Sequence, residues 1–273
     1  ATVGMLALGV GVTVAIFSVV NGVLLQPLPY PDSDRLVTVW KVNVQRGSRS
    51  TNVDHPDVRA WQEAVPDFRV AGYAGTRPTL TGLGEPEVLF GARVTDGLLS
   101  VFGVEPVLGR DLERSDDIPD GPRVVVLSHG FWTARLGADP EVVGSTVTLG
   151  GQPWEVVGVA PEGFSEPEGT DLWLPRRHPA DGCDHGCNIM AAVGRIPAGM
   201  GVSTLEERLH AVDRRLADDF PDAHRDVVTE LQLLRDHRVA DVRPALWILL
   251  VAVGMVLVAA LLWTLEHGAE TVS

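Results

Sequence analysis

Residues 3–25 read VGMLALGVGVTVAIFSVVNGVLL, and residues 244–265 read PALWILLVAVGMVLVAALLWTL. Neither stretch contains a charged residue. A helix of about 22 residues is about 33 Å long, which is enough to cross a hydrocarbon core of about 30 Å. We therefore expect two transmembrane helices, at residues 1–25 and 243–265, that flank one folded domain.

Two other interpretations of these stretches are open. Buried core helices of a soluble α/β protein would normally carry a polar stripe, whereas both stretches are apolar on every side. A cleavable signal peptide would need a basic segment before the first stretch and a small-residue cleavage site after it, and the sequence has neither. Length and the exclusion of charge favour membrane spans. Because Ala1 is not a start methionine, we also expect the sequence to be part of a longer protein.

The charge of the chain lies between the two stretches. All 22 Lys and Arg residues fall between Arg35 and Arg243, and the net charge is −14 at pH 7. A strongly acidic domain repels nucleic acid and anionic lipid headgroups, so we expect it to dock on neither. The spans themselves predict the lipid bilayer as a partner.

A β-α-β unit follows the first stretch. Residues 36–40 and 68–74 have strand composition, and residues 55–64 between them are typical of a short helix with Pro56 in its first turn.

A second β-α-β unit precedes the other stretch, with strands expected at residues 188–196 and 227–234. The helix between them is expected to begin at a capping box, Ser203 to Glu206, and to end at Pro221. The spacing predicts one apolar face on this helix, formed by Leu205, Leu209, Val212, Leu216 and Phe220.

Strand and turn signals dominate the part of the chain between these units. A two-glycine turn at Gly150-Gly151 predicts a hairpin of residues 147–149 and 152–159. Further elements are expected as strands at 87–94 and 123–127 and as short helices at 96–102 and 129–136. The fold class is therefore α+β, with a mostly β insertion between two β-α-β units.

Prolines stand where each span meets the domain. Pro27, Pro29 and Pro31 follow the first span, and Arg243-Pro244 precedes the second. Prolines end helices, and they also make short stiff junctions between a span and a domain, so both roles are open.

The candidate ligand groups are few. Cys183 and Cys187 lie near His178 and His185, and this spacing matches no established zinc pattern. A local disulfide between the two cysteines, free thiols and a metal site are the alternatives, and an oxidising compartment favours the disulfide. The acidic cluster Glu113, Asp116, Asp117 and Asp120 lacks the spacing of a calcium loop, so a solvated face is expected and no metal is assigned.

The sequence contains no catalytic motif. Ser128 and His129 are adjacent, but a catalytic triad is defined by geometry, and we expect Ser128 to cap a turn or helix. There is no G-x-S-x-G elbow and no G-x-x-x-x-G-K-[ST] loop, so neither a hydrolase nucleophile nor a nucleotide cofactor is predicted.

Several segments resemble one family, the MacB-like, FtsX-superfamily permeases, and within it the type called acidobacterial duplicated orphan permeases. The segments are 24–37 (LLQPLPYPDSDRLV), 91–110 (GARVTDGLLSVFGVEPVLGR), 125–132 (VVLSHGFW), 137–144 (GADPEVVG), 156–164 (VVGVAPEGF) and 241–246 (DVRPAL). The resemblance implies a periplasmic core domain in which a split porter-like α/β subdomain carries an inserted mostly β subdomain. The expected domains are a first span (1–25), a first porter-like part (26–81), the insertion (82–175), a second porter-like part (176–242), a second span (243–265) and a tail (266–273).

The same resemblance implies a function. It indicates a non-enzymatic permease component, in the cell membrane, with its central domain outside the cytoplasm. A separate cytoplasmic ABC ATPase subunit would hydrolyse nucleotide, and the spans would relay the movement to the domain for efflux or mechanotransmission. Two permease halves would form a homodimer or pseudo-dimer. A membrane-anchored extracytoplasmic hydrolase and a ligand-binding or sensor module are the alternative classes.

Overall fold

The computed structural model describes residues 28–177, 185–187 and 189–240, together with the single positions 11, 248, 251, 254, 255 and 258. The chain divides into two units, of which Pro29–Leu234 is compact and is called the head domain below. The other unit comprises Ala1–Leu28 and Arg235–Ser273. Among the described residues, no helix is long and apolar enough to cross a membrane. Both expected spans lie almost wholly outside these residues.

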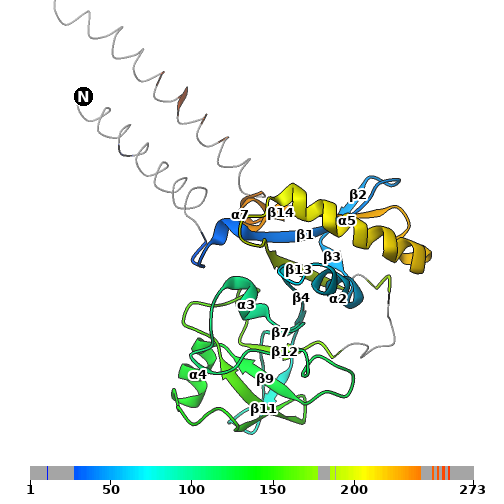
Figure 1. Ribbon diagram of the computed structural model, residues 1–273. Helices are drawn as coiled ribbons and strands as arrows, with labels where there is room; N and C mark the ends of the chain where they lie inside the picture. The colour runs from blue at the N-terminus through cyan, green and yellow to red at the C-terminus, as the bar shows by residue number, and fades with distance from the viewer. Residues whose placement is uncertain are drawn as a thin grey trace, which may run out of the picture. The chain divides into compact units, whose positions relative to one another are not determined.

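Four antiparallel strands form the first part of the head domain, in the order β14-β1-β13-β4 (Figure 1). They are β1 (Leu36–Asn43), β4 (Arg69–Thr76), β13 (Met190–Arg195) and β14 (Val227–Leu233). Helix α2 (His55–Ala64) connects β1 to β4, and α5 (Val202–Asp219) connects β13 to β14. Two interleaved β-α-β units with this strand order make a ferredoxin-like sheet, which confirms the two predicted units.

Local sequence explains where α2 begins. Asp54 is the N-cap, and its side chain and that of Asp57 form a reciprocal capping box. Pro56 occupies the first turn, where its missing N–H costs nothing. The helix spans the predicted residues.

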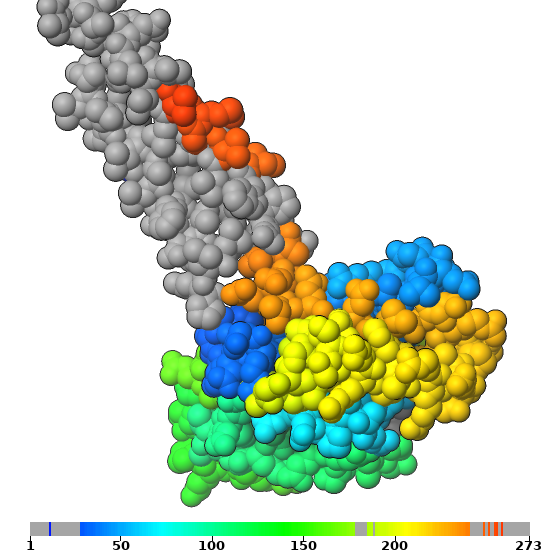
Figure 2. All heavy atoms as spheres, turned by 45° about the horizontal axis from the view of Figure 1, so that its top comes forward, coloured from blue at the N-terminus to red at the C-terminus, as the bar shows by residue number. Residues whose placement is uncertain are grey.

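Helix α5 corrects the predicted capping box. The helix begins at Val202 with Gly201 as N-cap and no side-chain cap, so Ser203 lies inside it. The Glu206 carboxylate instead accepts a hydrogen bond from the N–H of Leu231, at 2.8 Å, and is not free to cap the helix. The predicted apolar face is buried at Leu205, Leu209, Val212 and Leu216, whereas Phe220 is 41% exposed because the helix has already ended. Figure 2 shows α5, in yellow, on the surface of the head domain.

The remaining strands continue the same sheet. Strand β7 (Gly91–Val94) pairs with β4, and the order then runs β7-β12-β9-β11-β10-β5-β6. Short pieces β2, β3 and β8 pair off this path. The bounds of these elements are β2 (Ser48–Ser50), β3 (Asn52–Val53), β5 (Thr79–Thr81), β6 (Glu87–Val88), β8 (Leu108–Gly109), β9 (Val124–Leu127), β10 (Thr146–Leu149), β11 (Gln152–Val159) and β12 (Leu172–Pro175).

Short helices complete the described chain. They are η2 (Ser33–Arg35), α3 (Leu98–Phe102), α4 (His129–Leu136), α6 (Pro221–His224) and α7 (Leu234–Val239). Helix α4 matches its prediction. Helix α3 begins two residues later than predicted, because Gly97 adopts a left-handed conformation at φ 77° and Asp96 before it is engaged by Arg59.

The predicted hairpin is confirmed, and one predicted strand is broken. Strands β10 and β11 meet with Leu149 opposite Gln152, and both turn glycines have positive φ, as a two-residue turn requires. Residues 87–94 form two short strands instead of one. Between them, the N–H of Leu89 bonds to Pro78 and that of Phe90 to the Asp171 carboxylate, so the chain changes partners there.

Two hydrophobic cores are formed by the described residues of the head domain. The first is formed by buried side chains from residues 37–70 and 190–231, around Trp61 and Phe68, and lies between the four-stranded part of the sheet and helices α2 and α5. The second is formed by residues 80–174, around Trp154 and Phe131. The domain boundaries at residues 26, 82, 176 and 243 stay a prediction.

Candidate functional site

The predicted site residues lie mostly at the limits of the described chain. Pro29 and Pro31 are exposed at the start of the head domain, whereas Pro27, Arg243 and Pro244 lie outside the described residues. Their role as stiff junctions stays a prediction.

The cysteines are only half described. Cys187 is disulfide-bonded, but Cys183 lies outside the described residues, so the pairing of these two stays a prediction. The described residues contain no cluster of three or more ligands that could hold a metal ion.

Ser128 is a helix cap, as predicted. Its hydroxyl oxygen accepts a hydrogen bond from the N–H of Phe131, at 3.1 Å, at the start of α4. The ring of His129 packs edge-on against Trp132 instead. These contacts are those of a stable helix N-terminus.

Two members of the acidic cluster are buried and paired, which the expectation of a solvated face did not anticipate. Asp116 and Asp117 are 1% and 3% exposed. The guanidinium of Arg110 donates two hydrogen bonds to Asp116, at 2.6 and 3.1 Å. Glu113 and Asp120 are exposed, as expected.

Asp117 joins three distant segments of the head domain. Its Oδ2 accepts a hydrogen bond from Arg59 Nη2 at 2.6 Å and lies 2.9 Å from His55 Nε2, and both of these side chains come from α2. Its Oδ1 accepts from the backbone N–H of Arg177, at 2.7 Å, just after β12. We call Asp117, His55, Arg59 and this N–H the ionic latch, because they tie helix α2 of the first core to the loop and strand end of the second.

Arg59 extends the latch. Its Nη1 donates to the Asp96 carboxylate and to Gln62 Oε1, and the Gln62 amide donates in turn to the carbonyl of Val70 in β4. A planar guanidinium can hold two carboxylates and a side-chain amide at once, which a lysine could not do with the same geometry.

A second charged cluster lies under the first turn of α2. Lys41 of β1 is 8% exposed, and its Nζ lies 2.7 Å from Asp57 Oδ2 and 3.9 Å from Asp54 Oδ2. The Asp54 carboxylate also accepts from the backbone N–H of Gly186, at 2.7 Å. We call Lys41, Asp54, Asp57 and the neighbouring His224 the buried cluster.

The surroundings of His224 in this cluster favour its neutral form. Its pKa is lowered from its ordinary value chiefly by burial, and Lys41 and His185 lower it further, while Asp57 and Asp54 oppose the shift. Its Nε2 lies 3.0 Å from Nδ1 of His185, whose ring stacks on Phe220. A hydrogen bond between two imidazole rings needs one nitrogen that carries no proton. The two rings therefore cannot both be protonated while this bond exists.

The charges of the ionic latch and of the buried cluster hold segments of the head domain together. This arrangement contains buried charges with fixed partners, and none of its described side chains is an activated nucleophile. Sequence reasoning missed both groups because their partners are far apart in the chain. The available signal was local: Asp54 and Asp57 have the spacing of a capping box, and His55 and Arg59 stand one helical turn apart.

We predict that Asp57→Ala destabilises the head domain by about 3–5 kcal/mol, because it leaves the buried Lys41 ammonium without its nearest partner. Glu63→Ala on the same helix is the matched control. Glu63 pairs with Arg114 at 2.8 Å, but both side chains are more than half exposed, so its loss should cost less than about 1 kcal/mol. Denaturant unfolding of the purified chain measures both, and equal losses would contradict the assignment.

The family model described as "MacB-like periplasmic core domain" matches residues 1–209. Comparison with curated proteins gives no match.

Solved structures share the fold. The extracellular domain of the noncanonic ABC-type transporter YknZ from Gram-positive bacteria is 16% identical, with a TM-score of 0.51 over 72% of this chain and 99% of that one. The periplasmic region of MacB from Actinobacillus actinomycetemcomitans is 16% identical, with a TM-score of 0.53 over 84% and 98%. A domain of a putative permease protein from Porphyromonas gingivalis is 18% identical, with a TM-score of 0.54 over 75% and 93%.

These structures establish a common fold, and the family model covers more than half of the sequence. The mixed α+β head domain, built on one sheet, agrees with the predicted fold class. The chain therefore belongs to the MacB-like periplasmic core domain family of ABC transporter permeases.

Proposed function

We propose that the chain is the permease component of an export or mechanotransmission system that a separate cytoplasmic ABC ATPase drives. The observation that carries this proposal is the family match over residues 1–209. The two apolar stretches would anchor the chain in the cell membrane, with the head domain on the extracytoplasmic side. The permease would act as a homodimer or as a pair of permease halves, and it would not be an enzyme.

The geometry of the head domain supports a mechanical role. Strand β4 pairs with β13 on one side and with β7 on the other, and β7 pairs with β12 of the second core, so one continuous sheet connects the two cores. The ionic latch ties the same two cores through side chains. A pull applied to β1 would therefore pass into the second core without a hinge. The stiff proline junctions at residues 27–31 and 243–244 would connect the spans to this body.

The ATPase partnership makes a direct prediction. The tagged full chain, purified from membranes of its native host in mild detergent, should retain an ABC ATPase that mass spectrometry identifies. Residues 29–234 alone are the control and should not retain it, because the proposed ATPase is on the other side of the membrane. Absence of any ATPase from the full-chain preparation, or equal recovery with the control, would contradict the proposal.

The latch makes a second prediction. Asp117→Asn should impair the system, because the amide cannot pair with the Arg59 charge that joins the two cores. Asp120→Asn, the same change in the same loop, should have no effect because Asp120 is exposed. The measurement is the fraction of the deletion phenotype that each variant restores in the native host, at equal amounts of folded protein.

Asp57→Ala is a useful comparison in that experiment. It is expected to destabilise the head domain, and Asp57 makes no contact with Asp117 of the latch among the described residues. If Asp57→Ala and Asp117→Asn restore function equally well at equal amounts of folded protein, the latch has no role in transmission beyond stability.

A further inference from the structure

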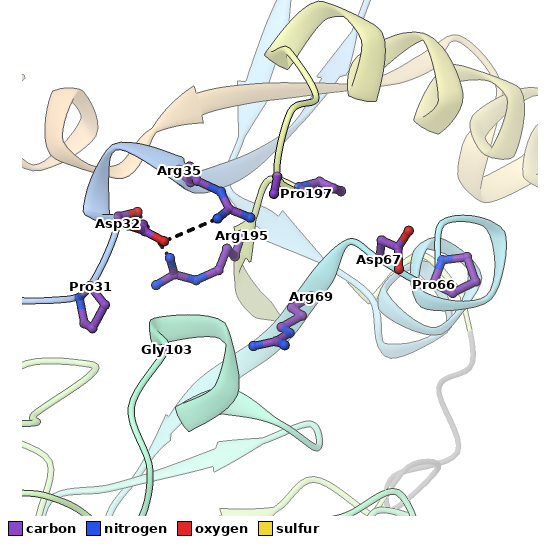
Figure 3. A pocket seen from close by; sticks show the side chains of 10 residues that line it. Pro31, Asp32, Arg35, Pro66, Asp67, Arg69, Gly103, Arg195 and Pro197 are labelled. Carbon is purple, nitrogen blue, oxygen red and sulfur yellow. Dashed lines mark hydrogen bonds and ion pairs between the residues drawn. The ribbon is translucent and has the colours of Figure 1, made fainter.

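A pocket of about 660 Å³ opens beside the start of β1, on the head domain. Three arginines line it in a protein whose net charge is −14 (Figure 3). Arg35 precedes β1, Arg69 begins β4, and Arg195 ends β13. The volume lies within the range of small-molecule sites, about 300–1,000 Å³.

The register of the sheet forces two of these charges together. Arg195 stands directly opposite Arg69 in the antiparallel pair of β13 and β4. On its other side, Arg195 is opposite Leu36, the neighbour of Arg35. Like charges directly opposite each other across two strands destabilise a sheet. This arrangement therefore needs a compensating negative charge.

The carboxylates of the pocket do not supply enough compensation. Asp32 Oδ2 lies 3.4 Å from Arg35 Nη1 and forms the one ion pair that the described residues give these arginines. Arg69 and Arg195 make no ion pair within the described part of the chain. Asp67, which also lines the pocket, lies apart from the arginines in Figure 3.

Backbone carbonyls accept hydrogen bonds from Arg35 and Arg195, and one N–H donor group of Arg195 is left without an acceptor among the described residues. Arg195 Nε donates to the carbonyl of Val101 at 2.6 Å, and Nη1 donates to that of Asp32 at 3.2 Å. Arg35 donates twice to the carbonyl of Ile196, at 2.9 and 2.7 Å. Arg195 is only 6% exposed, and its Nη2 is buried with no hydrogen-bond partner among the described residues. A buried charged donor without an acceptor is costly, so it points to a missing ligand.

Gly103 packs against this buried donor. A Cβ at position 103 would lie 3.1 Å from Arg195 Nη2 and would cover it. The glycine also has φ +70°, which ends helix α3, so its presence has a backbone reason as well. Gly103 and Arg195 both line the pocket, and the unpaired nitrogen of Arg195 lies buried beside Gly103.

Electrostatics agree with the geometry. Burial lowers the pKa of Arg195, and the charges of Arg35 and then Arg69 lower it further, although Asp32 and Asp34 oppose this. A guanidinium nevertheless stays protonated near neutral pH. An arriving anion would therefore meet three preorganised positive charges.

We propose that this pocket binds a phosphate-type oxyanion, held by Arg195, Arg69 and Arg35. Guanidinium groups match phosphate oxygens in geometry and form charge-assisted hydrogen bonds with them. The volume leaves room for an organic group attached to the phosphate. The phosphate group belongs either to free phosphate or to the headgroup of a phospholipid, and the arginines would bind its oxygens in the same way in both. This local site is an exception to the repulsion of headgroups that the net charge predicts, and it does not depend on the proposed ATPase.

The test is calorimetric titration of the full chain in a phosphate-free maltoside detergent, at constant ionic strength set with chloride. The probes are inorganic phosphate and monomeric dihexanoyl phosphatidylglycerol. Wild type should bind, and Arg69→Gln should bind at least about tenfold more weakly, because one charge-assisted hydrogen bond contributes about that much. Arg114→Gln, which removes another exposed positive charge away from the pocket, should bind like wild type.

The unfolding midpoint gives a second measurement. It would not respond to phosphate if Arg69 had only a structural role. Without phosphate, Arg69→Gln should be at least as stable as wild type, because it relieves the repulsion with Arg195. Added phosphate should raise the unfolding midpoint of wild type but not that of Arg69→Gln. Arg69 is exposed, and its side chain makes one hydrogen bond among the residues that the structure describes, at 3.3 Å to the carbonyl of Ser100, so this variant is expected to fold.

The outcomes separate the sources. Tighter binding of the lipid probe assigns the site to a phospholipid headgroup, and equal or tighter binding of inorganic phosphate assigns it to the free ion. Either result supports the proposal. No binding of either probe by wild type, or equal binding by Arg69→Gln and Arg114→Gln, would overturn it.

Discussion

Strand β4 is the element on which the head domain depends, because it joins the four-stranded part of the sheet to the strands that continue into the second core. Residues Arg69 to Tyr73 pair with β13, and Tyr73 to Thr76 pair with β7, so Tyr73 has partners on both sides. A backbone ladder can separate only if several hydrogen bonds break together. Relative movement of the two cores must therefore disrupt this strand. The ionic latch adds a second connection, between α2 and the segment after β12.

Charge is distributed over the two faces of the four-stranded part of the sheet. On the face covered by α2, Lys41 meets Asp54 and Asp57, and their opposite charges compensate one another. On the other face, Arg69 and Arg195 meet with like charge and without a carboxylate of their own among the described residues. The paired charges on the first face stabilise the head domain. The uncompensated arginines on the other face are the ones that we propose bind an oxyanion.

Sequence patterns predicted the elements that local chemistry determines. Pro56 and the acidic cap set the start of α2, and two glycines set the turn between β10 and β11. The capping box at Ser203 failed because the Glu206 carboxylate binds a distant strand. The ionic latch and the arginine pocket were missed for the same reason, since both arise from strand register and from partners far apart in the chain. Position along one strand does not reveal that Arg69 faces Arg195.

The central claim is that the head domain moves as one body because β4 and β7 make one continuous sheet between its two cores. Native-state hydrogen exchange of the full chain tests this most directly, because it measures the opening free energy of each backbone amide. We expect the amides of β13, β4, β7 and β12 to open together, with one common free energy that falls with denaturant at one common slope. If the amides of β7 and β12 open at a free energy lower by about 2 kcal/mol or more while β13 stays closed, the two cores are separate bodies and the account is wrong.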